Sequence, residues 1–315
     1  FYPTNVLVTG YDIIFFWVAR MIFSGIHNMD KTPFDTVLIH GIIRDSQGRK
    51  MSKSLGNGVD PLEVIDEYGA DALRFMLVTG NSPGNDIRYI PERVEAARNF
   101  ANKMWNASRF VMMNLDKEVM NKYADCKEYS LADKWILSRM NTLVKEVTEN
   151  MEKYELGIAL QKVYDFMWTE FCDWYIELVK GVLYGEDEKA KGIVYNVLNE
   201  VLQTGLKLLH PVMPFITEEI YTTLTDGDSI VLSNWPEYKE ALENDKAEKD
   251  MDFIIEAIKG LRNVRAEMNV PPSRKAKVIA HATNEAKEAF TSGVNYIEKL
   301  ASASEVVFIT DKNEV

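Results

Sequence analysis

The apolar residues between positions 130 and 225 recur at the 3.6-residue spacing of α-helices, and this periodicity restricts the fold more than any other feature of the sequence. The first series comprises Ile136, Met140, Leu143, Val144, Val147 and Met151. The second comprises Leu156, Leu160, Val163, Met167, Phe171, Trp174 and Leu178. Residues 187–209 and 214–225 continue the pattern, so this part of the chain is predicted to form an antiparallel helix bundle.

Residues 1–45 follow a different pattern, in which strand-like and helix-like segments alternate. NVLVTG predicts a buried strand that ends at Gly10, residues 11–26 predict a helix, and DTVLIHGIIRD predicts a strand pair that turns at SQGR. A strand, a crossover helix and a second strand form a right-handed parallel unit. Two strands make half a sheet at best, so the predicted fold class is a partial Rossmann-like α/β sheet followed by mostly α structure.

Helix signals and composition divide the chain further. Asp60, Pro61 and Glu63 form a strong helix start, because an acidic cap is followed by proline in the first turn. The chain leaves the bundle at NWPEY, residues 234–238, and ENDKAEKD is expected to be a polar linker. The segment after it mixes helical and strand-like patterns as a small α+β unit does. The predicted domains are 1–59, 60–115, 116–245 and 246–315. The incomplete sheet indicates a piece of a longer protein whose remaining sheet lies on the N-terminal side.

The charge of the chain is negative and unevenly distributed. The formal net charge is −12, yet residues 1–115 carry 12 basic and 12 acidic side chains, and residues 116–315 carry 24 and 36. This balance argues against a general nucleic-acid coat and restricts any RNA contact to small patches. Cys126 and Cys172 are far apart and form no CxxC pair, which indicates a reduced cytoplasmic protein with no disulfide framework and no zinc site. No apolar run is long enough for a membrane span.

The segment GRKMSKSLGNG, residues 48–58, has the most specific chemistry in the chain. Lys50, Ser52 and Lys53 lie on a loop that has glycines at both ends and a helix start just beyond it. Basic residues are common at solvated hairpin tips, which is the ordinary explanation for such a loop. Ammonium groups and helix N-termini also stabilise phosphate, and a mobile loop can deliver them when negative charge develops. The loop is therefore a candidate phosphate-binding segment.

KMSKS resembles the second signature of the class I aminoacyl-tRNA synthetases. Further segments of the chain are similar to the valyl type more than to the isoleucyl, leucyl or methionyl types: PTNVLVTGYDIIFFWVARMI, HGIIRDSQGRKMSKSLGN, YGADALRF, NFANKMWNASRF, FCDWYIE, HPVMPFITEEIY and RAEMNVPPS. One pentapeptide is a moderately specific signal, whereas these ordered segments together are very specific. The resemblance implies ATP-dependent ligation of L-valine to tRNA(Val) through a valyl-adenylate.

The resemblance also implies roles for residues around the loop. Lys50, Ser52 and Lys53 would contact the phosphates of ATP, bound with Mg²⁺, and the pyrophosphate that leaves. Gly10 and Asp12 would contact the adenylate, with Asp12 accepting from ribose hydroxyls. The strand at His40 and Gly41 would run past the adenine ring and contact it through backbone groups. The ordinary alternatives are a helix-start carboxylate for Asp12, a turn for Gly10 and a structural role for His40. No zinc and no cofactor beyond ATP are implied.

Ile13 and Trp17 are four residues apart and are expected to share one helix face. Core packing is the ordinary explanation for such a pair. The resemblance implies that they form walls of the valine pocket, where a rigid indole would exclude the extra methylene of isoleucine. An isoleucyl-type synthetase is the alternative within the same enzyme class.

The resemblance implies that residues 1–59 end the catalytic domain, residues 60–115 form a stem-contact fold and residues 116–245 bind the tRNA anticodon. Arg109 and Phe110 are the anticodon candidates, because aromatic stacking and phosphate contact are common means of reading unpaired RNA bases. A core position is an equal alternative for Phe110. The protein is expected to be a monomer.

The first class I signature, HxGH, is absent from the sequence, as is any segment that could form the editing domain of this family. We therefore expect a C-terminal piece that cannot activate valine alone. Two other functions stay open, namely a tRNA-binding module without its enzymatic half and a scaffold that kept only the fold.

Overall fold

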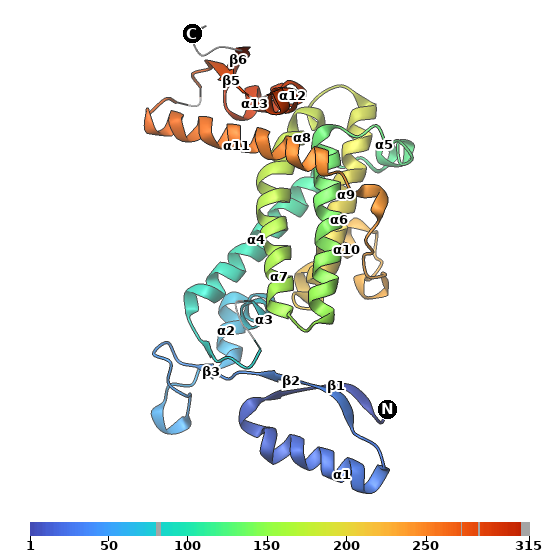
Figure 1. Cartoon of the computed structure of the whole chain (residues 1–315), viewed down its shortest axis with the longest axis vertical. Coiled ribbons are helices and arrows are strands. Elements are labelled where there is room, and N and C mark those ends of the chain that lie inside the picture. Colours follow the sequence, from blue (N-terminus) through green and yellow to red (C-terminus); the bar gives the residue numbers. More distant parts are fainter. Residues whose placement is uncertain (80–82, 272, 283, 310–315) are drawn as a thin grey trace. The chain divides into compact units, whose positions relative to one another are not determined.

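The computed structural model describes residues 1–79, 83–271, 273–282 and 284–309. They are mostly helical and contain small parallel sheets (Figure 1). The strands are β1 (Thr4–Gly10), β2 (Phe34–His40), β3 (Ile43–Arg44), β4 (Ile87–Arg88), β5 (Ala276–His281) and β6 (Ala303–Ile309). They pair as β1–β2, β3–β4 and β5–β6, and each pair is parallel.

The helices account for most of the described residues. The α-helices are α1 (Ala19–Met29), α2 (Pro61–Tyr68), α3 (Ala70–Val78), α4 (Pro91–Asn114), α5 (Lys117–Lys122), α6 (Leu131–Glu152), α7 (Leu156–Asp165), α8 (Ile176–Leu183), α9 (Glu188–Leu209), α10 (Pro214–Leu224), α11 (Asp245–Glu267), α12 (Asn284–Ser292) and α13 (Val294–Leu300). The 3₁₀-helices are η1 (Tyr11–Ile13), η3 (Lys53–Leu55), η5 (Ile230–Leu232) and η6 (Glu240–Leu242), and the π-helices are η2 (Ile14–Val18) and η4 (Phe166–Tyr175).

The chain forms two compact units, and each is assembled from separate segments. The first unit contains Phe1–Asn106, Lys145–Asp165 and Gly205–Pro236. The second contains Ala107–Val144, Phe166–Thr204 and Glu237–Val315. Three of these boundaries fall inside α4, α6 and α9. The two units therefore differ from the four continuous domains expected from the sequence, which stay a prediction.

The first unit begins with the predicted parallel strand–helix–strand arrangement. β1 and β2 pair in register from Thr4 with Phe34 to Gly10 with His40, which places the carboxyl ends of both strands side by side. In Figure 1, α1 runs along one face of this pair. Elsewhere in the unit, the rings of Phe75, Phe100 and Tyr164 pack together, with centroids 4.7–6.1 Å apart.

The predicted strand pair around the SQGR turn takes another form. Arg44 and Lys50 make a single antiparallel bridge, while β3 pairs in parallel with β4. The turn itself is present, because the Gly48 amide donates to the Asp45 carbonyl at 2.9 Å. β3 therefore gains its partner from a segment far along the chain, which local sequence patterns do not indicate.

The second unit is built around apolar helix faces. Trp135 and Trp174 are buried, whereas Trp168 is half-buried. Tyr175 is fully buried and donates from its hydroxyl to Asp133 at 2.7 Å. Burial raises the pKa of Tyr175 well above its usual value, so this hydroxyl stays protonated. At the end of the chain, β5, α12, α13 and β6 supply the mixed structure predicted there.

Candidate functional site

The KMSKS loop follows β3 and begins with a compact turn around the carboxylate of Asp45. This carboxylate accepts hydrogen bonds from the amides of Gln47 and Arg49, from Arg49 Nε at 2.7 Å and from Asn57 Nδ2 at 2.9 Å. Asp45 is only 8 % exposed. The hydrogen bond from Asn57, followed by those from Arg49, holds the pKa of Asp45 far below its ordinary value. Asp45 is therefore the ionised centre of the turn.

The signature residues lie on the part of the loop that follows this turn. Ser52 caps the 3₁₀-helix η3, since its hydroxyl accepts from the Leu55 amide at 3.3 Å and lies 3.1 Å from Ser54 Oγ. Lys53 is the first residue of η3 and its side chain is exposed. Within the described part of the chain, the Lys53 ammonium group forms no hydrogen bond or ion pair. This group is available to an anion from solution.

Lys50 connects the loop to the first strand-to-helix junction. Its Nζ lies 3.7 Å from Asp12 Oδ2, and both side chains are solvent-accessible. An exposed ion pair of this kind contributes little stability and can exchange with other partners. The contact brings the loop beside the carboxyl ends of β1 and β2, where open α/β sheets bind their ligands.

Gly10, Asp12 and His40 lie together at these strand ends. A Cβ atom on Gly10 would lie 2.8 Å from Asp12 Oδ1, which is too close, and 3.5 Å from His40 Cε1, which is an ordinary contact. His40 is exposed, and its Nδ1 lies 2.7 Å from the Gly41 carbonyl, which requires the proton on Nδ1. The structure thus brings together the residues that the sequence analysis grouped around the adenylate.

Asp86 holds this region together, and the sequence analysis missed it. It accepts from the Ile42 amide at 2.8 Å, from Tyr11 OH at 3.2 Å and from Arg44 Nε in a short ion pair. The Ile42 hydrogen bond and then the Arg44 hydrogen bond lower the pKa of Asp86. The same contact with Asp86 raises the pKa of Arg44. The one available signal was NSPGND, which local patterns identify only as a turn.

Gly41 allows the chain around Asp86 to approach β2 closely. A Cβ atom at position 41 would lie 1.9 Å from the Asn85 carbonyl oxygen, a distance that no side chain can occupy. Glycine is therefore required at this position by backbone contact. The same constraint does not depend on any ligand.

Ile13 and Trp17 are not on one α-helical face, contrary to the expectation. Ile13 ends the 3₁₀-helix η1, and Trp17 belongs to the π-helix η2, so four residues do not correspond to one α-helical turn. Trp17 is 59 % exposed and Ile13 39 %, which excludes core packing within the described chain as the reason for the pair. Their role in a valine pocket stays a prediction.

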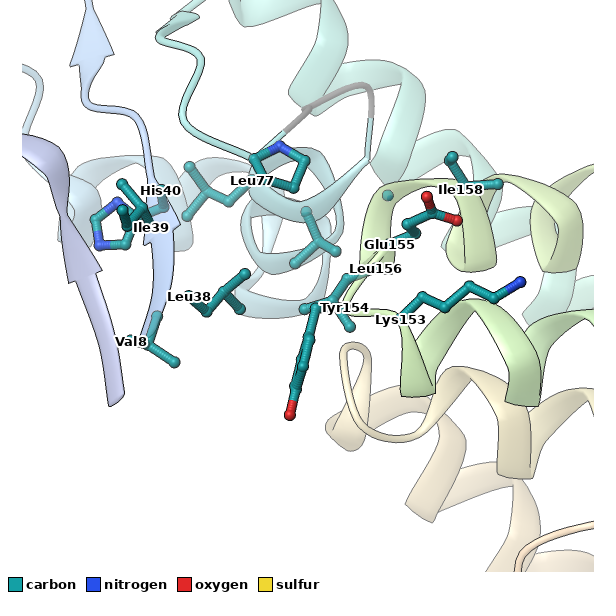
Figure 2. A pocket seen from close by; sticks show the side chains of 13 residues that line it. Val8, Leu38, Ile39, His40, Leu77, Lys153, Tyr154, Glu155, Leu156 and Ile158 are labelled. Carbon is teal, nitrogen blue, oxygen red and sulfur yellow. The ribbon is translucent and has the colours of Figure 1, made fainter. Parts of the chain in front are cut away.

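The first unit also contains a cavity of about 520 Å³ (Figure 2). Val8, Leu38 and His40 line it from the strands, and the turn between α6 and α7 lines the opposite side. Most of the lining is apolar, and Tyr154, with a φ of 61°, extends into it. Neither Ile13 nor Trp17 belongs to the lining, so this cavity is distinct from the predicted valine pocket.

The two anticodon candidates lie in the second unit. Arg109 is exposed, while Phe110 is half-buried. The ammonium group of Lys180 lies 5.5 Å from the centre of the Phe110 ring, so one face of the ring already has a cation–π partner. Phe110 is therefore neither an open stacking platform nor a fully buried core residue.

No group of three or more potential metal ligands is found among the residues that the structure describes. The described helices also include none long and apolar enough to cross a membrane.

Comparisons with known proteins agree with this geometry. Residues 1–89 match the family model of class I tRNA synthetases (I, L, M and V), and residues 133–280 match that of the anticodon-binding domain of tRNA ligases. The chain is 81 % identical to a valine–tRNA ligase of Clostridium perfringens and 70 % identical to that of Clostridium tetani, in both cases over its whole length. It spans 36 % of the length of each relative.

Solved structures of related synthetases share the fold. A leucyl-tRNA synthetase of Agrobacterium radiobacter K84, in a ternary complex with tRNA and LeuAMS, has a TM-score of 0.60 at 17 % identity. That match covers 96 % of this chain and 38 % of the other. A Mycobacterium tuberculosis methionyl-tRNA synthetase with bound methionyl-adenylate has a TM-score of 0.54 at 25 % identity and covers 70 % of this chain and 44 % of the other.

Proposed function

We propose that this chain belongs to the class I tRNA synthetase family and is the part of a valine–tRNA ligase that carries the KMSKS loop and the anticodon-binding helices. The complete enzyme would join L-valine to tRNA(Val) in two steps. Valine first attacks the α-phosphate of ATP and releases pyrophosphate, and the valyl-adenylate then reacts with the tRNA.

One observation carries the proposal: the KMSKS loop contacts the strand ends through Lys50 and Asp12 while the Lys53 ammonium stays exposed. An in-line displacement at phosphorus requires positioning and neutralisation of the leaving group more than covalent chemistry. Lys53 would supply positive charge to the pyrophosphate as it leaves. Lys50 would exchange Asp12 for phosphate oxygens, and Ser52 would donate to them. ATP would arrive with its own Mg²⁺ as part of the substrate.

The strand ends would hold the rest of the nucleotide. Gly10 leaves space beside β1 because it has no side chain, and the backbone at His40 and Gly41 would pass the adenine ring. Asp12, once released by Lys50, would accept from the ribose hydroxyls. The proximity of these residues supports this arrangement.

Ile13 and Trp17 would contact the valine side chain. Their exposure supports contact with something other than the described chain. A rigid indole leaves no space for an extra methylene, which favours valine over isoleucine. The 81 % identity to a valine–tRNA ligase also supports valine.

The helical part would bind tRNA(Val). We place the stem-contact fold at 60–115 and the anticodon-binding helices at 116–245, with Arg109 and Phe110 as candidate contacts. The match of residues 133–280 to an anticodon-binding model supports this assignment. The whole enzyme would act as a monomer in the cytoplasm.

A chimeric enzyme tests the proposed reaction. The matching segment of the Clostridium perfringens valine–tRNA ligase is replaced by this chain, and exchange of labelled pyrophosphate into ATP is measured. We expect exchange that depends on valine and is weaker with isoleucine, and no exchange from the chain alone. An inactive, folded chimera, or one that prefers isoleucine, would contradict the proposal.

A tRNA-binding module without catalysis is the second candidate function, because the anticodon-binding match does not depend on an active loop. Filter binding of transcribed tRNAs to the chain distinguishes it from a scaffold. Preference for tRNA(Val) that is lost when the middle anticodon base changes would support RNA reading. Equal binding of all tRNAs would exclude it.

A further inference from the structure

One side chain connects the two ends of the KMSKS loop. Asn57 Nδ2 donates to Asp45 Oδ2 at 2.9 Å and to the Lys50 carbonyl at 3.3 Å. Its Oδ1 accepts from the Ser52 amide at 2.9 Å. Asn57 thus contacts the turn before the signature and two backbone groups inside it.

The other hydrogen bonds of the loop do not replace these contacts. Those of the Ser52 hydroxyl reach only Ser54 and Leu55, which lie on the same side of the loop. The bridge between Arg44 and Lys50 holds only the start of the signature. Gly56 has a φ of 60°, so the chain turns back sharply just before Asn57. The path of residues 50–52 therefore depends chiefly on the Asn57 side chain.

The chemistry of the site requires a primary amide of this length. Asp45 and the Lys50 carbonyl each accept from this side chain, and the Ser52 amide needs an acceptor. Only the primary amides of asparagine and glutamine supply two donors and an acceptor from one group. Glutamine is longer by one methylene and would displace the loop. Aspartate would place a second carboxylate beside Asp45, and alanine would remove one donor from Asp45 and leave the Ser52 amide without its acceptor.

We propose that Asn57 is a positioning residue that fixes the backbone of the KMSKS loop, so that Lys50 lies beside Asp12 and Lys53 extends into solvent. This inference depends on the proposed function only for the identity of the ligand that the loop binds. The bracing itself is a property of the chain, and it can be measured without any substrate.

Trypsin cleavage of the chain tests the bracing directly, because Lys50 and Lys53 are cleavage sites within the loop. We expect Asn57→Ala to raise the cleavage rate after these lysines about tenfold, as the loss of hydrogen bonds to a charged partner implies. Asn28→Ala is the matched control, since the Asn28 amide donates only to the Ser24 carbonyl of its own helix. Equal cleavage of both variants, or cleavage raised throughout the chain, would overturn the proposal.

A double-mutant cycle tests the contact between Asn57 and Asp45. In Asn57→Asp, the new carboxylate meets two acceptors, the Asp45 carboxylate and the Lys50 carbonyl. In Asp45→Asn, the new amide NH₂ group meets donors that held the carboxylate, such as Asn57 Nδ2 and Arg49 Nε. Each single change should therefore open the loop at least as much as Asn57→Ala. The double change Asp45→Asn with Asn57→Asp restores one donor and one acceptor and should recover part of the slow cleavage. Additive effects of the two changes would contradict a direct contact.

The same variants in the chimeric enzyme connect the bracing to the reaction. We expect Asn57→Ala to slow adenylate formation about tenfold while the KM for valine and the Tm stay unchanged. If Asn57→Ala forms adenylate at the parent rate while Lys53→Ala forms it slowly, the positioning role is overturned and the proposed function stays intact. An unchanged rate in Lys53→Ala would instead count against the proposed function.

Discussion

Gly41 has no space for a side chain, because the backbone of the segment that carries Asp86 lies directly against it. The change Gly41→Ala would force a methyl group to within 1.9 Å of the Asn85 carbonyl oxygen, so the backbone that carries Asp86 would have to move. We expect a loss of about 2–3 kcal/mol in the free energy of unfolding, as overpacking of a closed site typically costs. Urea denaturation measures this loss.

Gly58→Ala is the control for that change. A Cβ atom at position 58 would meet nothing within 4 Å, and the residue does not have a positive φ. We expect a change within about 0.5 kcal/mol. Equal destabilisation by the two alanines would show that the close approach to Asn85 does not determine the role of Gly41.

Asp86 makes the stability of the first unit dependent on pH. Its pKa in the folded chain is lowered, chiefly by the Ile42 amide and then by Arg44. Ionised Asp86 therefore stabilises the fold above the unfolded pKa of about 3.9, and this contribution is lost as the pH falls through the lower folded value. Asp86→Asn should be less stable than the parent at neutral pH and should approach it in acid. A difference that stays constant with pH, measured by urea denaturation, would contradict this assignment.

Single residues were predictable where a motif identifies them, and not where only the fold brings them together. Lys50, Ser52 and Lys53 were found from their order in the sequence. Asp86 was missed because its partner Arg44 is 42 positions away. The role of Asn57 was not predictable, since its contact with Asp45 forms only when the loop closes on itself.

At the scale of elements, α3 holds the start of α10 through charged side chains. Asp71 accepts from the amides of Phe215 and Ile216 at 3.2 and 2.7 Å, so it caps a helix to which it does not belong. Arg74 donates to the carbonyls of Pro211 and Val212 just before that helix. Both side chains therefore fasten the connection between α9 and α10 to the segment that follows the KMSKS loop.

Asp71→Ala tests this fastening. Two amides at the start of α10 would lose their acceptor, and we expect a loss of about 1–2 kcal/mol in the free energy of unfolding. Asp66→Ala, on the exposed side of α2, should change it by less than about 0.5 kcal/mol. Hydrogen exchange of the Phe215 and Ile216 amides should accelerate only in Asp71→Ala. Unchanged exchange at these amides would contradict the cap.

The elements were predictable where their apolar spacing is regular. The series from Ile136 to Met151 lies within α6, and residues 187–209 coincide closely with α9. The second series was expected to continue as one α-helix, but η4 widens it to a π-helix between Phe166 and Tyr175. Both helix types bury one apolar face, so spacing alone does not distinguish them. The pairing of β3 with β4 was also not predictable, because strands of this length give almost no periodic signal.

At the scale of the whole molecule, the net charge of −12 limits how the chain can bind RNA. Two of the basic side chains near the C-terminus already donate hydrogen bonds to carbonyl groups of the chain itself. Arg262 donates to the Leu300 carbonyl, and Arg265 donates to the carbonyls of Pro271 and Arg274. Phosphate contacts should therefore be few.

The salt dependence of tRNA binding measures the number of phosphate contacts. Each phosphate contact contributes about −0.7 to −0.9 to the slope of log K against log salt concentration, so we expect a slope of about −2 to −4 for tRNA binding by the chain. Filter binding at several salt concentrations gives the slope. A value near −10 would indicate a broad basic face and would contradict the restriction to small patches.

The central claim is that Lys53 delivers positive charge to the pyrophosphate as valine is activated. Single-turnover formation of valyl-adenylate by the chimeric enzyme tests it most directly, with Lys31→Ala as the control because that lysine is also exposed in the first unit. We predict that Lys53→Ala slows adenylate formation about 10²- to 10³-fold, as the loss of a group that stabilises the transition state does, and that Lys31→Ala does not. Adenylate formation by Lys53→Ala at the parent rate would contradict the claim.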